Sequence, residues 1–83
     1  MIGQLTFEHD GTRVTATLDD DLRWGDADAG VLDRLDGAFY AEPVPGLPNL
    51  LIGRHLLYQA AARLDGAVTL PTLPRREPEA MPA

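Results

Sequence analysis

The sequence predicts an α+β fold in which an N-terminal β-hairpin packs against two helices in a two-layer arrangement. Two alternating apolar and polar stretches flank an Asp-Gly dipeptide near the N-terminus. Two later segments show apolar residues at helical spacing, and both contain the pentapeptide Arg-Leu-Asp-Gly-Ala before a short strand-like run. These observations predict a hairpin, two helices and one or two short added strands, followed by a Pro-rich C-terminal tail.

The hairpin comprises residues 2–9 and 12–18 around Asp10-Gly11, a dipeptide suited to the positive φ angles of a type I′ turn. A two-residue loop places Phe7 opposite Val14 and Leu5 opposite Ala16 on one face. The other face pairs polar or oppositely charged residues. Because a shift of one residue would mix the two sets, this pattern predicts one register.

Residues 19–25 are expected to leave the sheet, because three successive aspartates cannot continue a buried strand. Leu22 and Trp24 are expected to turn back onto the core. Asp26 or Asp28 then caps the first helix, where a carboxylate suits the helix dipole. Glycine commonly follows a helix end, so this helix is expected to end at Gly37, before a strand over residues 38–41. The alternative is a helix that continues through Gly37 to residue 40, at a cost of about 1 kcal/mol.

The second helix is expected over residues 49–64, with Pro48 at its first position. His55, Gln59 and Arg63 lie together on its polar side. Gly66 is the expected left-handed residue after this helix, and residues 67–70 follow as a strand. If that strand joins residues 38–41, the connection is a right-handed parallel crossover. The apolar arc of the helix contains Leu50, Gly53, Leu56, Leu57, Ala60, Ala61 and Leu64.

The chain divides into one α+β domain at residues 1–70 and a tail at residues 71–83. The tail is expected to be polyproline II or disordered, because it holds four of the seven prolines. It is interpreted either as an inert terminus or as a segment that docks in a partner's groove. A core of this size contributes only a few kcal/mol of net stability, which leaves tight packing or association with a partner as the source of further stability.

Composition excludes several function classes. The chain contains no cysteine, serine or lysine, which removes disulfides, thiolate metal sites and the usual nucleophiles. The predicted set of catalytic residues, metal ligands and cofactors is therefore empty. No apolar run approaches the roughly 18 residues that span a membrane, and the N-terminus lacks a signal-peptide pattern. The expectation is a soluble, cytoplasmic protein that does not bind membranes.

The formal net charge of −6 is concentrated in one segment. Residues 19–42 hold eight acids and two arginines, a sum of −6. Phosphate-backbone binding needs clustered positive charge, so nucleic acid is not expected as a direct partner. A block of carboxylates instead favours a protein with a basic surface.

Metal and acid–base patterns are weaker. The run from Asp26 to Gly30 resembles the start of an EF-hand loop, but Gly37 stands where a bidentate glutamate is required. His9 and His55 match no metal-ligand spacing, and both are interpreted as surface histidines. No Gly-rich phosphate loop, catalytic triad or zinc pattern is present.

The favoured hypothesis is a small acidic, non-enzymatic protein-interaction module: an accessory, regulatory or assembly subunit. One alternative is an acidic DNA-mimic inhibitor of a nucleic-acid-binding protein, of phage or mobile-element origin. Another is a small metal-dependent enzyme. A homodimer is left open. The predicted partner-binding residues are Asp19, Asp20, Asp21, Trp24, Asp26, Asp28, Asp33, His55, Gln59 and Arg63.

Overall fold

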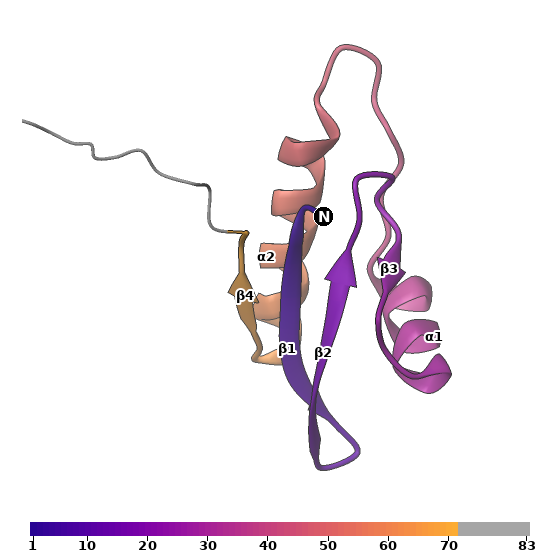
Figure 1. Ribbon diagram of the computed structural model, residues 1–83, viewed down its shortest axis with the longest axis vertical. Coiled ribbons are helices and arrows are strands. Elements are labelled where there is room, and N and C mark those ends of the chain that lie inside the picture. The colour runs from indigo at the N-terminus through magenta and orange to yellow at the C-terminus, as the bar shows by residue number, and fades with distance from the viewer. Residues whose placement is uncertain (72–83) are drawn as a thin grey trace, which may run out of the picture.

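The computed structural model describes residues 1–71 and has an α+β architecture (Figure 1). Four antiparallel strands form one sheet in the order β3-β2-β1-β4, and two helices lie beside it. The predicted fold class is confirmed. The elements are β1 (Gly3–His9), β2 (Thr12–Leu18), β3 (Trp24–Gly25), α1 (Ala29–Ala38), α2 (Asn49–Leu64) and β4 (Ala67–Thr69).

The β1–β2 hairpin has the predicted register. Phe7 pairs with Val14, Leu5 with Ala16 and Gly3 with Leu18. The turn residues Asp10 and Gly11 have φ values of 53° and 78°, as a type I′ turn requires. The apolar pairs face the helices, and the other face is polar.

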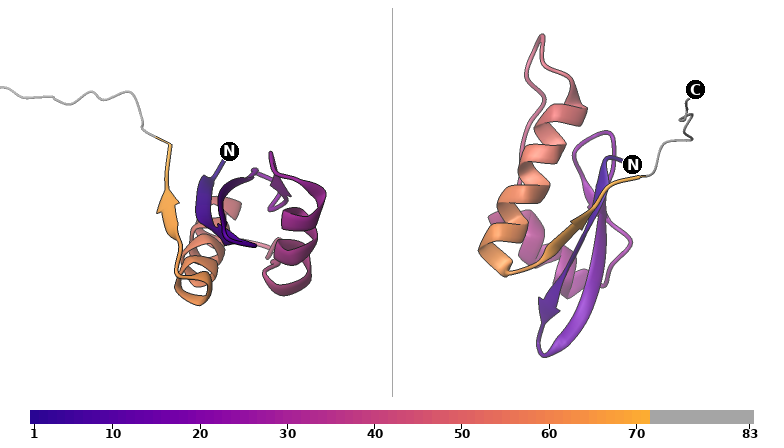
Figure 2. Two further views of the ribbon diagram at one scale, coloured as in Figure 1. Left: turned by 90° about the horizontal axis from the view of Figure 1, so that it is seen from below. Right: turned by 90° about the vertical axis from the view of Figure 1, so that its left-hand side faces the viewer.

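Both helices cover the same face of the sheet (Figure 2, left), and α2 contacts β1 and β4 while α1 contacts β2 and β3. The opposite face has no helix over it in the described part of the chain, and there the hydroxyls of Thr6 and Thr15 lie 2.9 Å apart. The core lies between the two layers. It contains Ile2, Leu5, Phe7, Ala16, Leu18, Leu22, Trp24, Val31, Leu35, Phe39, Leu56, Leu57 and Ala60.

The expectation that residues 19–25 leave the sheet is wrong for the last two of them, Trp24 and Gly25. The Asp19 carboxylate accepts hydrogen bonds from the backbone N–H groups of Asp21 and Arg23, both at 2.9 Å, and so closes a tight loop. This loop returns the chain to the sheet as β3, where Trp24 pairs with Leu18. Leu22 and Trp24 are buried, as predicted.

The first helix corrects two predictions. Helix α1 continues through Gly37 to Ala38, so Gly37 does not end it, and the continuous-helix alternative is nearer the structure although it placed the end at residue 40. Residues 38–41 form no strand, and therefore no parallel crossover exists among residues 1–71. Asp28 is the residue before the helix, but its side chain makes no capping hydrogen bond.

The physical reason for the missing strand lies at Phe39. Its backbone turns extended directly after α1, with φ −129° and ψ 97°, and its ring enters the core. The buried Phe39 carbonyl oxygen accepts a hydrogen bond of 2.7 Å from Trp24 Nε1. Tertiary contacts thus occupy the backbone that a strand would have needed.

Helix α2 agrees with its predicted span, with two shifts of one residue. Pro48 precedes the helix rather than occupying its first position. At the other end Asp65, not Gly66, takes the left-handed conformation, at φ 54°. The N–H of Gly66 donates to the carbonyl of Ala61 at 2.9 Å, as in a Schellman motif displaced by one residue.

Glycines allow two close approaches in the core. A Cβ on Gly53 would lie 2.9 Å from Ile2 Cγ2, and one on Gly66 would lie 2.5 Å from the carbonyl oxygen of Thr6. Gly66 therefore brings β4 against β1, where Val68 pairs with Leu5. The predicted added strand exists at Ala67–Thr69, and it is antiparallel to β1.

Two sequence predictions concern the chain ends and membranes. Apart from Pro71, the predicted Pro-rich tail lies outside the described residues. No helix within residues 1–71 combines the length and apolar character needed to cross a membrane.

Candidate functional site

A tight turn between the two helices exposes apolar side chains. Val44-Pro45-Gly46-Leu47 has proline and glycine at the two central positions, and Gly46 has a φ of 82°, which is typical of a type II turn. The Leu47 N–H donates to the Val44 carbonyl at 3.0 Å. This pairing holds the side chains of Val44 and Leu47 together, with exposed fractions of 50% and 44%.

The first turns of α2 form the facing wall. Leu51, which is 52% exposed, lies one helical turn before His55, and His55 lies one turn before Gln59. Ile52 is partly buried and Leu56 is buried. One face of this helix packs against the sheet. The face that carries Leu51, His55 and Gln59 is therefore free to line a groove with the loop.

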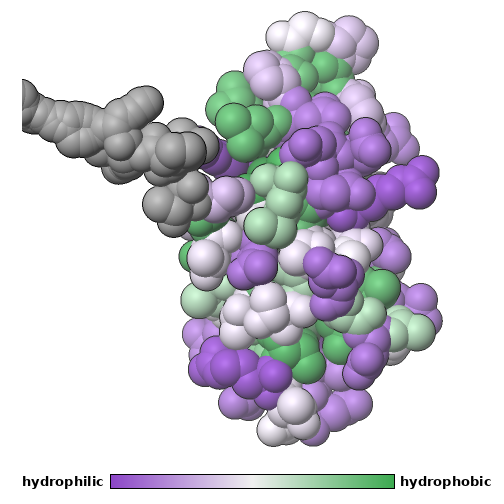
Figure 3. Space-filling view, in the orientation of Figure 1, coloured by the Kyte–Doolittle hydropathy of each residue, from purple (hydrophilic) through white to green (hydrophobic). Residues whose placement is uncertain are grey.

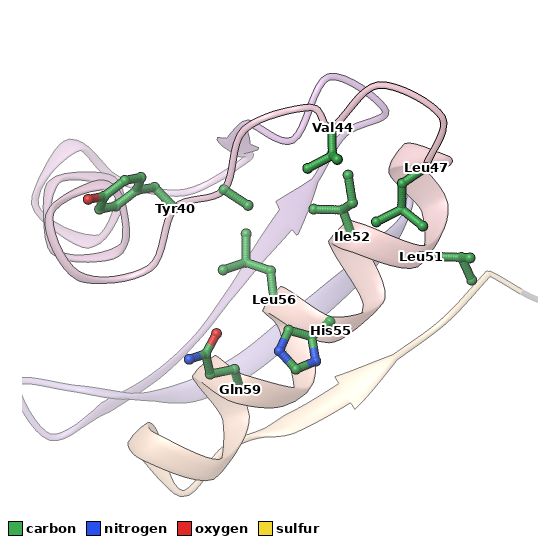
Figure 4. Close-up of a pocket in the computed structure, with 9 residues that line it drawn as sticks. Tyr40, Val44, Leu47, Leu51, Ile52, His55, Leu56 and Gln59 are labelled. Carbon is green, nitrogen blue, oxygen red and sulfur yellow. The ribbon is translucent and has the colours of Figure 1, made fainter.

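These two walls enclose an apolar groove of about 280 Å³ (Figure 4). In the close-up, Val44, Leu47 and Ile52 gather at one end, and the Leu51 side chain projects from α2 away from them. His55 and Gln59 follow α2, and the Tyr40 ring lies on the α1 side. Tyr40 is 71% exposed. The apolar groove is lined by Tyr40, Ala41, Val44, Leu47, Leu51, Ile52, His55, Leu56 and Gln59.

The lining carries no carboxylate and no arginine, but charges flank it. Asp33 and Asp36 on α1, and Glu42 in the loop, are exposed. The α1 arginine is engaged elsewhere: Arg34 Nη1 lies 3.2 Å from His9 Nδ1 and 3.4 Å from the carbonyl oxygen of Glu8. Helix α1 and the loop after it, which contributes Tyr40, Ala41 and Val44 to the groove, therefore carry exposed negative charge.

The opposite flank is different. Helix α2 contains no acid, and its Arg63 guanidinium lies 5.9 Å from the centre of the Phe39 ring. Arg63 thus tethers the second half of α2 to the residue that follows α1. It is exposed but does not line the groove.

Three predicted site residues come from α2, and the groove contains two of them. His55 and Gln59 line it, and Arg63 lies close by on the same helix. Trp24 lies in the core at 7% exposure with its indole N–H bonded to Phe39, so it presents little surface to a partner.

The predicted acidic triplet has structural partners. Asp19 closes the β2–β3 loop with its carboxylate. Asp20 lies 3.2 Å from the N-terminal ammonium through its carboxylate, and its carbonyl accepts a 2.9 Å hydrogen bond from Asn49 Nδ2 at the start of α2. Asp21 is exposed. These contacts join the N-terminus, the loop and α2.

The remaining predicted acids lie between β3 and α1 or on α1. Asp26 accepts a 3.4 Å hydrogen bond from the Thr17 hydroxyl, while Asp28 and Asp33 are exposed. Within the described residues, no three His, Asp or Glu side chains converge in a way that could hold a metal ion. The inhibitor and metalloenzyme alternatives remain predictions from sequence.

Most of the groove was not predicted. The apolar members Tyr40, Val44, Leu47 and Leu51 were absent from the predicted site, which emphasised charge. A signal existed: the segment 44–51 places four large apolar residues around Pro-Gly, more than a connecting loop needs. The Figure 3 view shows a mixed surface over the strands and apolar surface toward the loop and the start of α2.

Comparisons with protein-family models, curated proteins and solved structures give no match to this chain. The groove is therefore interpreted from its own residues. Exposed aliphatic and aromatic side chains around a concave apolar surface are suited to binding another apolar surface.

Proposed function

We propose that this protein is a non-enzymatic protein-interaction module, an accessory, regulatory or assembly subunit that holds an apolar segment of a partner protein in the groove. The carrying observation is the cluster of Tyr40, Val44, Leu47 and Leu51, each at least 44% exposed around a common concavity. A small protein gains stability by covering such a surface, because apolar burial contributes about 25 cal/mol per Å².

The partner segment is an amphipathic helix with basic residues beside its apolar face. An apolar groove beside a helix accepts side chains spaced one turn apart on a bound helix. Charge complementarity supports basic flanks, because Asp36 and Glu42 lie on the α1 and loop side and the whole chain has a net charge of −6. A cytoplasmic location is part of the same proposal and rests on the sequence alone.

The composition of the groove supports a binding function over catalysis. Its polar members are His55, Gln59 and the Tyr40 hydroxyl, and no carboxylate lines it to orient the imidazole. The described core contains no buried polar or charged side chain. General acid–base chemistry needs such groups in mutual reach, so binding is the function that these residues favour.

The test uses a helical probe of about 18 residues, long enough to fold on a surface, built from leucine and lysine with the leucines on one face. Calorimetric titration into the full chain is expected to show saturable binding that weakens as salt is added. A second probe with glutamate in place of lysine should bind at least about tenfold more weakly, a difference of roughly 1.4 kcal/mol.

Adjacent leucines provide a matched control. Leu51 lines the groove and Leu50 does not, yet their exposed fractions are 52% and 46%. Leu51→Gln should weaken binding of the leucine–lysine probe about tenfold, since a buried leucine contributes roughly 1.5–3 kcal/mol. Leu50→Gln should leave the affinity within about twofold. Equal affinities for the two variants, or no saturable binding, would refute the proposal.

A further inference from the structure

The outer edge of β2 is only partly paired. Strand β3 pairs with Thr17 and Leu18 at one end of β2. Along residues 12–16, the described chain has β1 on one side of β2 and no strand on the other (Figure 1). Five of the seven residues of β2 therefore form an open sheet edge.

The hairpin turn determines which backbone groups point outward. In a two-residue hairpin, His9 and Thr12 exchange hydrogen bonds, so every second residue of β2 from Thr12 onward faces β1. Arg13 and Thr15 then direct their N–H and C=O groups away from the hairpin. The outward bond from the Asp19 N–H to the Arg23 carbonyl, at 3.0 Å, has the same phase.

No hydrogen bond within residues 1–71 reaches the backbone of Arg13 or Thr15 on this outer side, and both residues are exposed. Proteins commonly protect such edges with proline, bulges or several charges. This edge has one charge, Arg13, which pairs across the hairpin with Glu8.

The edge formed by β4, on the other side of the sheet, offers fewer backbone groups for pairing. Strand β4 has three residues, and in its register Val68 alone directs backbone groups outward. Pro71, which has no N–H group, follows two residues after β4. The β2 edge therefore offers more pairing positions than the β4 edge.

A cavity lies beside the open part of β2. Its volume is about 340 Å³, and it separates the end of the hairpin from the start of α1. Val14 and Val31 supply apolar wall, while Asp10 and Asp28 supply carboxylates. The lining residues are His9, Asp10, Thr12, Val14, Asp28, Gly30 and Val31.

We infer that the β2 edge binds an extended peptide segment of a partner protein as an added antiparallel strand. Two of its residues exchange backbone hydrogen bonds with Arg13 and Thr15. Because side chains alternate along a strand, the residue opposite Thr12 points toward the helix layer and enters the cavity. A long basic side chain fits there, with its stem along the valines and its charge near Asp28.

The occupant is a single strand and not a second copy of this chain. Helix α1 contacts both β2 and β3, so it lies beneath the line along which the added strand would run. Figure 2 (left) shows α1 on that side of the sheet. A second copy paired through β2 would bring its own α1 to the same place, where the two helices would collide.

The probe is the peptide Thr-Val-Glu-Lys-Thr, acetylated and amidated, which ends short of Gly25, the β3 residue that pairs with Thr17. Its first threonine stands opposite Thr15, its glutamate opposite Arg13 and its lysine opposite Thr12. Titration up to millimolar concentrations, followed by NMR of the isotope-labelled full chain, should shift the amide signals of Arg13 and Thr15 most. Slower hydrogen exchange at these two amides should accompany saturation.

A backbone-modified peptide provides the main control. N-methylation at the first threonine and the glutamate keeps every side chain but removes the two N–H groups that the carbonyls of Thr15 and Arg13 accept. The methylated peptide should bind about tenfold or more weakly, as expected for losing two hydrogen bonds. Equal binding of both peptides, or no saturable shift at Arg13 and Thr15, would overturn the inference.

Substitution of two acidic residues distinguishes binding in the cavity from a general attraction between opposite charges. Asp28 lines the cavity and makes no capping hydrogen bond, and Asp33 is exposed on α1 outside it. Asp28→Asn should weaken the peptide several-fold, whereas Asp33→Asn should not. Equal losses would contradict the cavity assignment. Leu51→Gln, which tests the groove, should leave this affinity unchanged, so the two proposals can fail independently.

Discussion

The pentapeptide Arg-Leu-Asp-Gly-Ala occurs at residues 34–38 and again at residues 63–67, and it adopts a different structure each time. In the first copy the helix continues through Asp36 and Gly37. In the second copy the helix stops before Asp65, which turns left-handed, and Gly66 leads into β4. Five identical residues therefore do not determine where a helix ends; the surrounding contacts do.

The glycines show the difference most directly. A Cβ at Gly37 would meet no atom within 4 Å, whereas one at Gly66 would lie 2.5 Å from the Thr6 carbonyl oxygen and 3.1 Å from Phe7 Cβ. The second copy is held against β1, and the first faces open space. Helix propensity alone treats both positions alike.

The largest expected effect is that of Gly66→Ala. The added methyl would press on backbone that the sheet holds in place, and such overpacking costs about 2–3 kcal/mol. Urea unfolding followed by the fluorescence of the single, buried Trp24 measures it. An unfolding free energy within 0.5 kcal/mol of the parent protein (roughly the scatter of a neutral surface change) would show that β4 can move away from β1.

The second largest effect concerns the hydrogen bond that follows the end of α1, after the first copy of the pentapeptide. Trp24→Phe removes the indole N–H that donates to the buried Phe39 carbonyl at 2.7 Å. The unpaired carbonyl should cost about 1–3 kcal/mol. Unfolding is followed by circular dichroism, because the variant lacks tryptophan. Tyr40→Phe, which removes a hydroxyl from a side chain 71% exposed, is the control and should change stability little.

The third effect has the opposite sign. Gly37→Ala replaces glycine inside a helix, with open space around the new methyl, and should stabilise the protein by up to about 1 kcal/mol. Thermal unfolding should show a higher midpoint. Destabilisation by this variant would mean that Gly37 has a packing role that the first copy does not reveal.

How much of this could be predicted from sequence depends on the range of the interactions. The hairpin register was predictable because alternation and the Asp10-Gly11 turn act between neighbours. The end of α1 was not, because it depends on Trp24 reaching Phe39 across 15 residues. The shift from Gly66 to Asp65 as the left-handed residue likewise follows from packing on Thr6, which no local pattern encodes.

The candidate site likewise has one part that local sequence predicts and one part that depends on distant segments. Placing His55 and Gln59 on one exposed side of α2 needed only helical spacing, and the structure agrees. The apolar groove needed the knowledge that the 39–48 loop folds back beside α2. Charge is visible in a sequence, whereas a concave apolar surface arises only when two distant segments meet.

The smallest effect compares the aspartates of the two copies. Asp65 has a φ of 54°, a conformation that glycine adopts without the strain a side chain adds, so Asp65→Gly should stabilise by about 0.5 kcal/mol. Asp36 is helical, so Asp36→Gly should destabilise by about the same amount. Equilibrium urea unfolding of both variants measures the pair. Opposite signs for one substitution in identical pentapeptides would establish that backbone conformation, set by tertiary contacts, decides the effect. If both substitutions changed the stability in the same direction, a cause shared by the two copies would explain the result. The loss of one negative charge from an exposed position is such a cause.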